Sequence, residues 1–260
     1  MKTNVVIPET MEDFNFPIST KKIAYGLPNG LWGFTDKFKA VIREDNEELI
    51  SIVSPTYKLV SNKDLIDTCL ETLSKTDIPF NLHLGDKAGK LMNFVTSQRM
   101  KLTISFPEMK IYDGEEGVEV CAFLENSYNS SQAINFQIGL LRLICTNGAT
   151  SYIARKMLRF KHVESFQLEY FKQGIDNLYM KIPEIKERVE ILHNIHDRET
   201  MNNIIEKAGK ENKKLAEHCL ETAPANMWEL YNALTFFITH NLAVRRQTAY
   251  FNWVAKQFQL

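Results

Sequence analysis

The sequence has few cysteines and no long apolar run. Its cysteines are Cys69, Cys121, Cys145 and Cys219, and no Cys-x-x-Cys spacing occurs, which argues against a disulfide framework and a zinc ribbon. No apolar run reaches the roughly 18 residues that a transmembrane helix needs. The N-terminal residues lack the basic and hydrophobic regions of a signal peptide. These absences predict a soluble, cytoplasmic protein whose thiols are small side chains of the core.

Glycine, proline and an excess of one charge are also scarce. With 11 glycines and 8 prolines among 260 residues, the chain is neither collagen-like nor rich in linkers. The 31 basic and 32 acidic side chains leave a formal net charge of -1, so no bulk electric field indicates a partner. The hydrophobic share of 44% is enough for a substantial core. The composition predicts a globular protein and leaves its partner open.

Motifs for catalysis and cofactor binding are absent as well. The chain has no Gly-x-Ser-x-Gly and no Walker motif, and the glycines of residues 26–33 lack the spacing of a dinucleotide-binding loop. His193 and His196 lie three residues apart on an expected helix, but the His-Glu-x-x-His pattern is missing. We therefore expect no cofactor, no metal and no catalytic residue. An enzyme with a nucleophilic Cys145 beside His162, or with a metal at the two histidines, is the third alternative.

What the chain does contain divides it into three parts of one domain. Residues 1–36 mix proline, glycine and aromatic side chains, which predicts an irregular N-terminal arm. The arm's expected anchors on the body are Phe14, Phe16 and Trp32. Residues 37–164 are predicted to form a β-rich core, and residues 165–260 a helical subdomain of the same domain. A β-rich part followed by a helical part indicates an α+β fold.

The β-rich core is expected to be an antiparallel meander with one early helix. Residues 38–42 and 49–53 flank a polar turn and predict a hairpin. Ser61 has the position of a helix cap, and apolar residues recur at helical spacing from there to about residue 75. The further strands are predicted over residues 80–84, 91–95, 102–106, 118–124 and 134–144. The helices of the second half are predicted over residues 165–181, 183–197, 200–222, 226–242 and 246–258, with Pro183 and Pro224 in first turns.

Carboxylates are missing from two long stretches of the sequence. None occurs in residues 126–163, and none in residues 87–107. Phosphate binding needs cations that no nearby acid screens, so we predict that both stretches contact nucleic-acid phosphates. The first rank of expected contacts is Arg142, Arg155, Lys156, Arg159, Lys161 and His162. The second rank is Lys87, Lys90, Arg99 and Lys101.

Aromatic side chains accompany these cations. Single-stranded nucleic acid is bound by cations that follow its backbone and by rings that stack on its bases. Tyr128 and Phe160 are candidates for stacking if the fold exposes them. By contrast, residues 108–125 are rich in acids, and such a segment can imitate nucleic acid toward a protein partner. Surplus aromatic residues in the last two helices indicate a contact with a second subunit.

Three blocks of the sequence carry a resemblance to a known family. They are residues 124–133 (LENSYNSSQA), residues 141–149 (LRLICTNGA) and residues 160–162 (FKH). Together with residues 228–235 (WELYNALT), they resemble a family encoded by phages and plasmids, domain of unknown function 932. The Arg-x-x-Cys-x-Asn segment of the second block is the most specific part of this resemblance.

The resemblance implies a mobile-element protein with strands first and helices later. This layout is similar to that of phage single-strand annealing proteins of the RecT, Red-beta and ERF kind. Two departures from the family's pattern occur in this chain. Tyr128, Asn129 and Ser130 replace His-Asp-Gly, and Val163 replaces Thr. No role that requires that histidine or that acid is therefore expected here.

Residues and resemblance together favour a non-enzymatic phage or plasmid protein that binds single-stranded nucleic acid. We expect it to act as a homo-oligomer and as an accessory factor of strand annealing or recombination. The alternative is a protein-binding module that inhibits or redirects a host nuclease or defence complex. The expected partners are thus single-stranded nucleic acid or a host protein, and no membrane.

Overall fold

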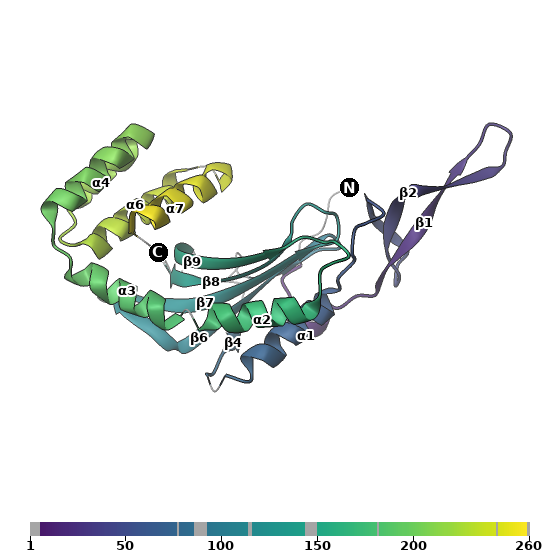
Figure 1. The fold of residues 1–260 in the computed structure, drawn as a ribbon, viewed down its shortest axis with the longest axis horizontal. Helices are drawn as coiled ribbons and strands as arrows, with labels where there is room; N and C mark the ends of the chain where they lie inside the picture. The colour runs from purple at the N-terminus through teal and green to yellow at the C-terminus, as the bar shows by residue number, and fades with distance from the viewer. Residues whose placement is uncertain are drawn as a thin grey trace.

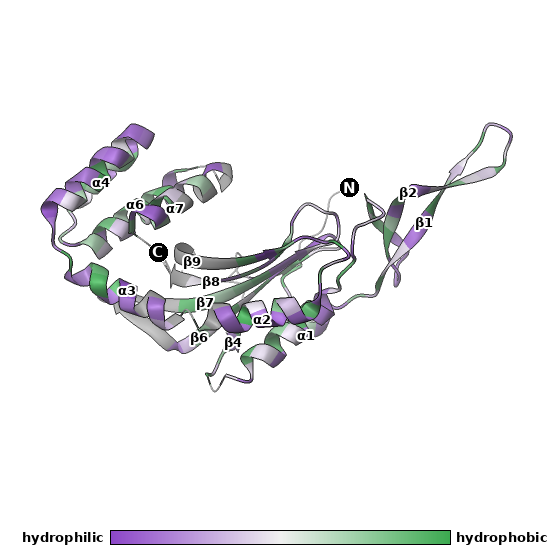
Figure 2. Cartoon of the chain, in the orientation of Figure 1, coloured by the Kyte–Doolittle hydropathy of each residue, from purple (hydrophilic) through white to green (hydrophobic). Residues whose placement is uncertain are grey.

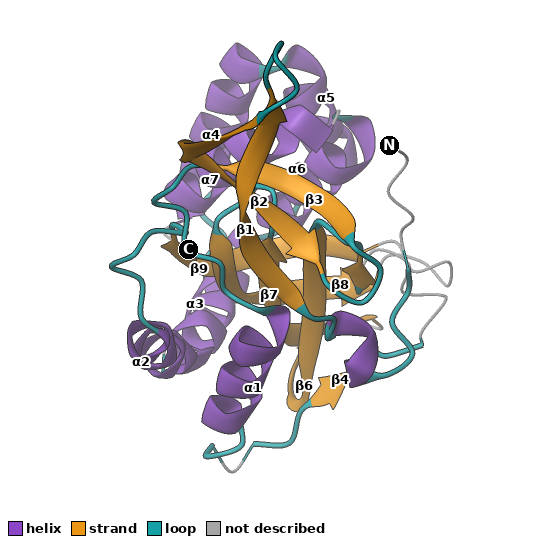
Figure 3. Cartoon of the chain, turned by 90° about the vertical axis from the view of Figure 1, so that its right-hand side faces the viewer, coloured by secondary structure: helices purple, strands orange, loops and turns teal. Residues whose placement is uncertain are grey.

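The computed structural model describes residues 6–76, 78–85, 93–113, 116–143, 150–180, 182–242 and 244–258. In these residues two antiparallel sheets are joined to a set of helices, so the α+β prediction is confirmed. Figure 3 shows two groups of helices with strands between them.

The first sheet has the strand order β1-β2-β3, with β1 (Ile18–Gly26), β2 (Trp32–Arg43) and β3 (Glu48–Val53). The pairing of β2 with β3 confirms the predicted hairpin. A short 3-10 helix, η1 (Met11–Phe14), precedes the sheet. Strands β1 and β2 extend beyond the rest of the molecule as a two-stranded ribbon (Figure 1). We call residues 18–43 the ribbon.

The prediction of an irregular arm over residues 1–36 is wrong for the ribbon. Phe14 and Phe16 are buried as expected, but Trp32 is 69% exposed and anchors nothing. The proline and glycines of the tip turn the chain between two strands, and Gly30 has a φ of 81°, which favours glycine. They mark a hairpin tip, since Leu27 donates its N–H to the carbonyl of Leu31 at 2.8 Å.

The second sheet has the order β4-β6-β7-β8-β9, and β5 pairs separately with β6. Its strands are β4 (Asn81–Leu82), β5 (Phe94–Val95), β6 (Arg99–Asp113), β7 (Glu116–Ser127), β8 (Ile134–Leu143) and β9 (Thr150–Phe160). All of its pairings are antiparallel, as predicted for a meander.

One face of this sheet is apolar and lies under helices α1 (Asn62–Leu73) and α2 (Leu168–Tyr179). Leu102, Leu124 and Phe136 are successive cross-strand partners, and all three are fully buried. The ring of Phe171 in α2 meets that of Phe136 edge-on, with 6.2 Å between centroids. Ser61 caps α1 by accepting the N–H of Asp64 at 2.9 Å, as predicted. The even-numbered positions of β6 up to Phe106 therefore face these helices, and the odd-numbered ones up to there face the other side of the sheet.

The helical part continues with α3 (Ile182–Asn194), α4 (Arg198–Glu211), α5 (Lys213–Thr222), α6 (Met227–Asn241) and α7 (Val244–Phe258). Helix α6 contacts α3, α5, α7 and strand β9. Figure 2 shows α4 as largely hydrophilic, whereas more hydrophobic residues lie along α6. The helix predicted over residues 200–222 is in fact two helices, because the extended backbone of Asn212 ends α4 and its side chain caps α5. Pro183 lies in a first turn as predicted, but Pro224 lies in the connection before α6.

Candidate nucleic-acid interface

The two stretches without carboxylates become neighbouring parts of one sheet. Lys101 in β6 pairs with Glu125 in β7, Glu125 pairs with Asn135 in β8, and Asn135 pairs with Arg159 in β9. Directly opposed residues of antiparallel strands point to the same face. At about 4.8 Å per strand, the row from Lys101 to Arg159 crosses roughly 14 Å of the sheet. We call these four residues the polar row.

Three cations at this end of the sheet are exposed: Arg99, Arg159 and Lys161. None of them forms an ion pair within the part of the chain that the structure describes. Arg99 begins β6, and Lys161 follows the last residue of β9. The first sheet adjoins the same end, because Ser51 in β3 donates its hydroxyl to the carbonyl of Tyr128 at 2.7 Å. These cations therefore lie beside the base of the ribbon without a carboxylate partner among the described residues.

Glu125 places one carboxylate inside the polar row. Its Oε2 accepts hydrogen bonds from the side-chain amides of Gln132, Asn135 and Gln137. The ammonium of Lys101 lies 5.0 Å from the centroid of the Phe123 ring. The row thus alternates positive, negative, neutral and positive side chains, and it is not a uniformly basic groove. The sequence prediction assigned Glu125 to the acidic segment 108–125, at the border of an acid-free stretch, whereas the fold puts it between two of the predicted contacts.

Asn135 leaves a hydrogen-bonding group unused in the polar row. The residue is 8% exposed, its Nδ2 donates to Glu125, and its buried Oδ1 has no partner among the described residues. A buried amide oxygen without a donor is unusual in a folded protein. This oxygen is buried, so it is not part of the exposed surface that Arg159 presents beside it.

His162, a predicted phosphate contact, is placed inside the protein. It is 8% exposed, its ring stacks on Tyr57 with 4.8 Å between centroids, and its Nδ1 lies 3.2 Å from the carbonyl of Lys58. Burial lowers the pKa of His162 below its usual value, so the imidazole is neutral at pH 7. His162 is therefore not a cation for phosphate, since Tyr57 and Lys58, in the segment between β3 and α1, pack against it.

The two predicted stacking rings are also not available. Tyr128 is 1% exposed, its ring meets Phe16 edge-on, and its hydroxyl accepts the N–H of Asn62 at 2.7 Å. Phe160 packs against Phe166 and Phe171. The condition for stacking on a base, an exposed ring, is thus not met by Tyr128, and Phe160 is half-buried against the core.

Other predicted residues lie partly or wholly outside the described residues. Arg142 belongs to β8, and Arg155 and Lys156 belong to β9, where they pair with Gly139 and Ile138. The structure describes the backbone of these three residues but not their side chains. Lys87, Lys90 and Cys145 lie outside the described residues altogether, and so do most side chains of the acidic segment 108–125.

The histidine pair on α3 is engaged in packing. The ring of His193 lies 5.4 Å from that of Trp228, and Nδ1 of His196 lies 3.0 Å from the carbonyl of Ala225. Within the described ranges, no group of three or more histidine, cysteine, aspartate or glutamate side chains is placed to hold a metal ion. Cys69, Cys121 and Cys219 are buried and form no disulfide. The pair therefore does not converge with a third ligand in the part of the chain that is described.

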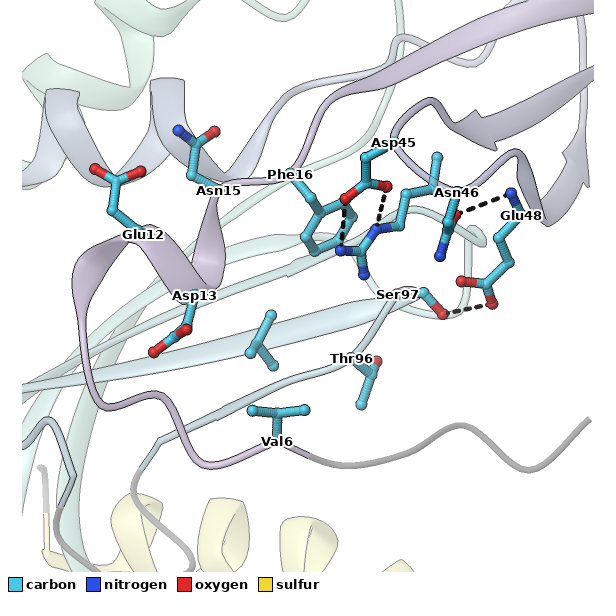
Figure 4. A pocket seen from close by; sticks show the side chains of 12 residues that line it. Val6, Glu12, Asp13, Asn15, Phe16, Asp45, Asn46, Glu48, Thr96 and Ser97 are labelled. Atoms are coloured by element: carbon cyan, nitrogen blue, oxygen red, sulfur yellow. Dashed lines mark hydrogen bonds and ion pairs between the residues drawn. The ribbon is translucent and has the colours of Figure 1, made fainter.

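A cavity of about 490 Å³ lies at the base of the ribbon, and sequence reasoning did not find it (Figure 4). The carboxylates around it belong to Glu12, Asp13, Asp45 and Glu48. Arg43 forms a bidentate ion pair with Asp45 at 2.7 and 2.8 Å, and this pairing lowers the pKa of Asp45. The N–H groups of Thr10 and Glu9 likewise lower the pKa of Asp13. The cavity is therefore acidic at neutral pH and repels phosphate, which sets one border of the candidate interface.

The block of residues 124–133 owes its position to buried hydrogen bonds. Asn126 donates to the carbonyl of Val60 at 3.0 Å and to Oδ1 of Asn62 at 2.9 Å, which ties β7 to the start of α1. The hydroxyl of Ser127 donates to the carbonyl of Gln132 at 2.7 Å and accepts its N–H at 3.1 Å. Asn126 and Ser127 thus fix the turn between β7 and β8, and neither faces a ligand.

Comparison with known proteins identifies the family. No curated protein and no solved structure matches the chain. Among the described residues, no helix has both the length and the apolar character to cross a membrane. Residues 49–254 match the model of the family described as Domain of unknown function (DUF932). Because the match covers more than half of the chain, the protein belongs to this family.

Proposed function

We propose that the protein is a phage or plasmid factor that binds single-stranded nucleic acid and catalyses no reaction. It acts as a homo-oligomer in strand annealing or recombination, where the pairing chemistry belongs to the strands themselves. The observation that carries this proposal is the group of exposed cations without carboxylate partners at one end of the second sheet. Arg99, Arg159 and Lys161 neutralise successive phosphates there, and Lys101 adds a fourth charge.

The polar row explains a preference for single strands. Amide side chains form hydrogen bonds with base edges, and these edges are free in a single strand but paired in a duplex. The half-buried Gln132 and the exposed Arg159 lie on either side of Asn135, so a base edge and a phosphate can be bound close together. Glu125 repels phosphate and holds the amides in place, which keeps the backbone of the strand toward the three exposed cations.

The test is the salt dependence of oligonucleotide binding, measured by fluorescence anisotropy with a labelled single strand of mixed sequence. The variant Arg99→Ala/Arg159→Ala/Lys161→Ala removes three phosphate contacts. Each contact contributes about 0.7 to the slope of log K against log salt, so the slope falls by about 2. At 1 M salt the phosphate contacts contribute little, so the variant and the wild type should bind about equally there. A slope difference of about 2 over the tenfold range from 1 M to 0.1 M salt then makes the variant bind about a hundredfold more weakly at 0.1 M.

A matched control separates contacts from net charge. Lys207→Ala/Lys214→Ala/Lys256→Ala removes three exposed cations from α4, α5 and α7, and its slope should equal that of the wild type. Equal losses in both variants would assign the effect to overall charge and contradict the interface. If the wild-type protein binds no oligonucleotide at low salt, the proposed function is rejected. If the wild-type protein then captures a host protein, the alternative of a protein-binding module is favoured.

A further inference from the structure

The ribbon is strongly basic, although the whole chain is nearly neutral. Residues 18–43 contain five basic side chains and one carboxylate, a net charge of +4 in a chain of net charge -1. Its exposed apolar side chains are Tyr25, Leu27, Leu31, Trp32, Phe34 and Phe38. Cations interleaved with exposed rings are the composition that single-stranded nucleic acid binds.

Two of the rings lie on one face of the ribbon and are exposed. Trp32 pairs with Gly26 and Phe34 pairs with Ala24, so neither ring has a large cross-strand neighbour. Trp32 is 69% and Phe34 is 68% exposed. On the opposite face, the Tyr25 ring lies across Gly33, where an added Cβ would come within 2.6 Å of a ring atom. The ribbon therefore covers its own glycine with Tyr25 and leaves Trp32 and Phe34 to solvent.

The spacing of the two rings suits a base between them. Residues two apart in a strand are separated by roughly 6.8 Å, at a rise of about 3.4 Å per residue. Stacked bases follow one another at about 3.4 Å along a strand. One base inserted between Trp32 and Phe34 would thus lie at stacking distance from both rings. Aromatic stacking on a base tolerates any sequence, because every base has a π-face.

Further toward the body, beyond a register shift between Lys22 and Ile23, two cations stand in direct opposition. Lys22 pairs across the strands with Lys39, and like charges placed opposite each other destabilise a sheet. Asp36 lies 3.6 Å from Lys22, and Lys39 has no carboxylate partner among the described residues. An anion bound between the two ammonium groups removes this repulsion. A phosphate is such an anion, one step along the ribbon from the rings.

We propose that the ribbon is a second contact for the same single strand, with a base between Trp32 and Phe34 and a phosphate between Lys22 and Lys39. This inference rests on the proposed function, since it supplies the stacking rings that the sheet lacks. The ribbon joins the body next to Arg99, because the side chain of Gln98 donates to the carbonyl of Ile50 in β3 at 3.4 Å. A strand bound beside Arg99 therefore reaches the ribbon by passing beside the acidic cavity without entering it.

Tryptophan fluorescence tests this contact directly, with unlabelled oligo-deoxythymidine as the probe. The tryptophans are Trp32, the fully buried Trp228 and the half-buried Trp253, so Trp32 is the ring that stacking should quench. The variant Trp32→Ala/Phe34→Ala should lose this quenching and bind about five- to 150-fold more weakly. Its salt slope should stay that of the wild type, whereas Lys22→Ala/Lys39→Ala should lower the slope by about 0.7. The control Tyr170→Ala, an exposed ring on α2, should bind like the wild type.

The outcomes separate this inference from the function itself. If the wild type binds the oligonucleotide and Trp32→Ala/Phe34→Ala binds equally well, the ribbon contact is refuted while the function stands. If the wild type does not bind at all, the function fails first. A change of molar mass in Trp32→Ala/Phe34→Ala without nucleic acid, measured by light scattering, would assign the ribbon to a second copy of the chain and overturn the inference. Both rings are exposed, so an unchanged thermal midpoint is expected and confirms that the variant is folded.

Discussion

Asn126 offers a sharp test of the hydrogen bonds that position the candidate interface. Its side chain is fully buried and donates to Val60 and to Asn62. Asn126→Ala leaves two buried acceptors without their donor, and each such loss costs about 1–3 kcal/mol. The substitution also removes the buried Oδ1 of Asn126, which has no partner among the described residues, and this offsets part of the loss, so we expect the free energy of unfolding to fall by about 2–4 kcal/mol. At about 2–4 °C per kcal/mol, the thermal midpoint should fall by roughly 4–16 °C.

The assay is calorimetric unfolding of the wild type, Asn126→Ala and Asn126→Asp, with the exposed Asn202→Ala as a control that should change stability by less than about 0.5 kcal/mol. A carboxylate at position 126 cannot donate, and burial raises its pKa above the unfolded value of about 3.9. The folded state thus favours the protonated carboxyl group, and ionisation at higher pH destabilises it. The free energy of unfolding of Asn126→Asp should therefore fall further below that of the wild type at pH 7.5 than at pH 4. A loss below about 1 kcal/mol in Asn126→Ala, or a pH-independent deficit in Asn126→Asp, would refute the reasoning.

Two more predictions concern packing and titration. Gly174→Ala in α2 brings a Cβ within 2.7 Å of the Leu158 side chain and should cost about 1–3 kcal/mol, although alanine favours helices. The combination with Leu158→Ala should be less damaging than the sum of the single changes in chemical denaturation, and strict additivity would contradict the contact. Burial lowers the pKa of His162, so its contribution to stability is complete above pH about 6.5 and is lost as the pH falls through its folded pKa. His162→Phe keeps a ring on Tyr57 and should show a smaller drop in thermal midpoint between pH 7.5 and 5.5 than the wild type, and an equal drop would exclude this role.

The elements that the sequence predicted correctly are those set by local chemistry. Ser61 caps its helix through a hydrogen bond that spans three residues, and the turn before β3 joins neighbouring strands. The ribbon was missed because both of its faces meet solvent beyond the body, so its strands need no alternation of apolar and polar residues. Asn212 was missed as a break because asparagine suits both a helix end and a helix start, and no glycine or proline marks the position.

Predicting the candidate site from sequence was limited by register. Acid-free segments can be read from the sequence, but whether Lys101 and Arg159 share a face depends on pairings across four strands. A shift of one residue in any pairing would send the side chains to opposite faces. The same pairings put Glu125 between the two cations, and the bridge of Tyr57 to Val163 encloses His162. Neither result can be derived from spacing along one strand.

Only one of the two proposed contacts, the one at the end of the second sheet, lies within the residues that match the family model. The polar row and the exposed cations lie within residues 49–254, the part that matches the family model, whereas the ribbon precedes that part. Buried hydrogen bonds of Asn126 and Ser127 fix the turn between β7 and β8, so the block that carries the resemblance sets the shape of the sheet end. That end supplies charge and amide groups but no exposed ring among the predicted residues. Phosphate neutralisation alone would give binding that salt abolishes, and the ribbon's rings add a contact that salt does not screen.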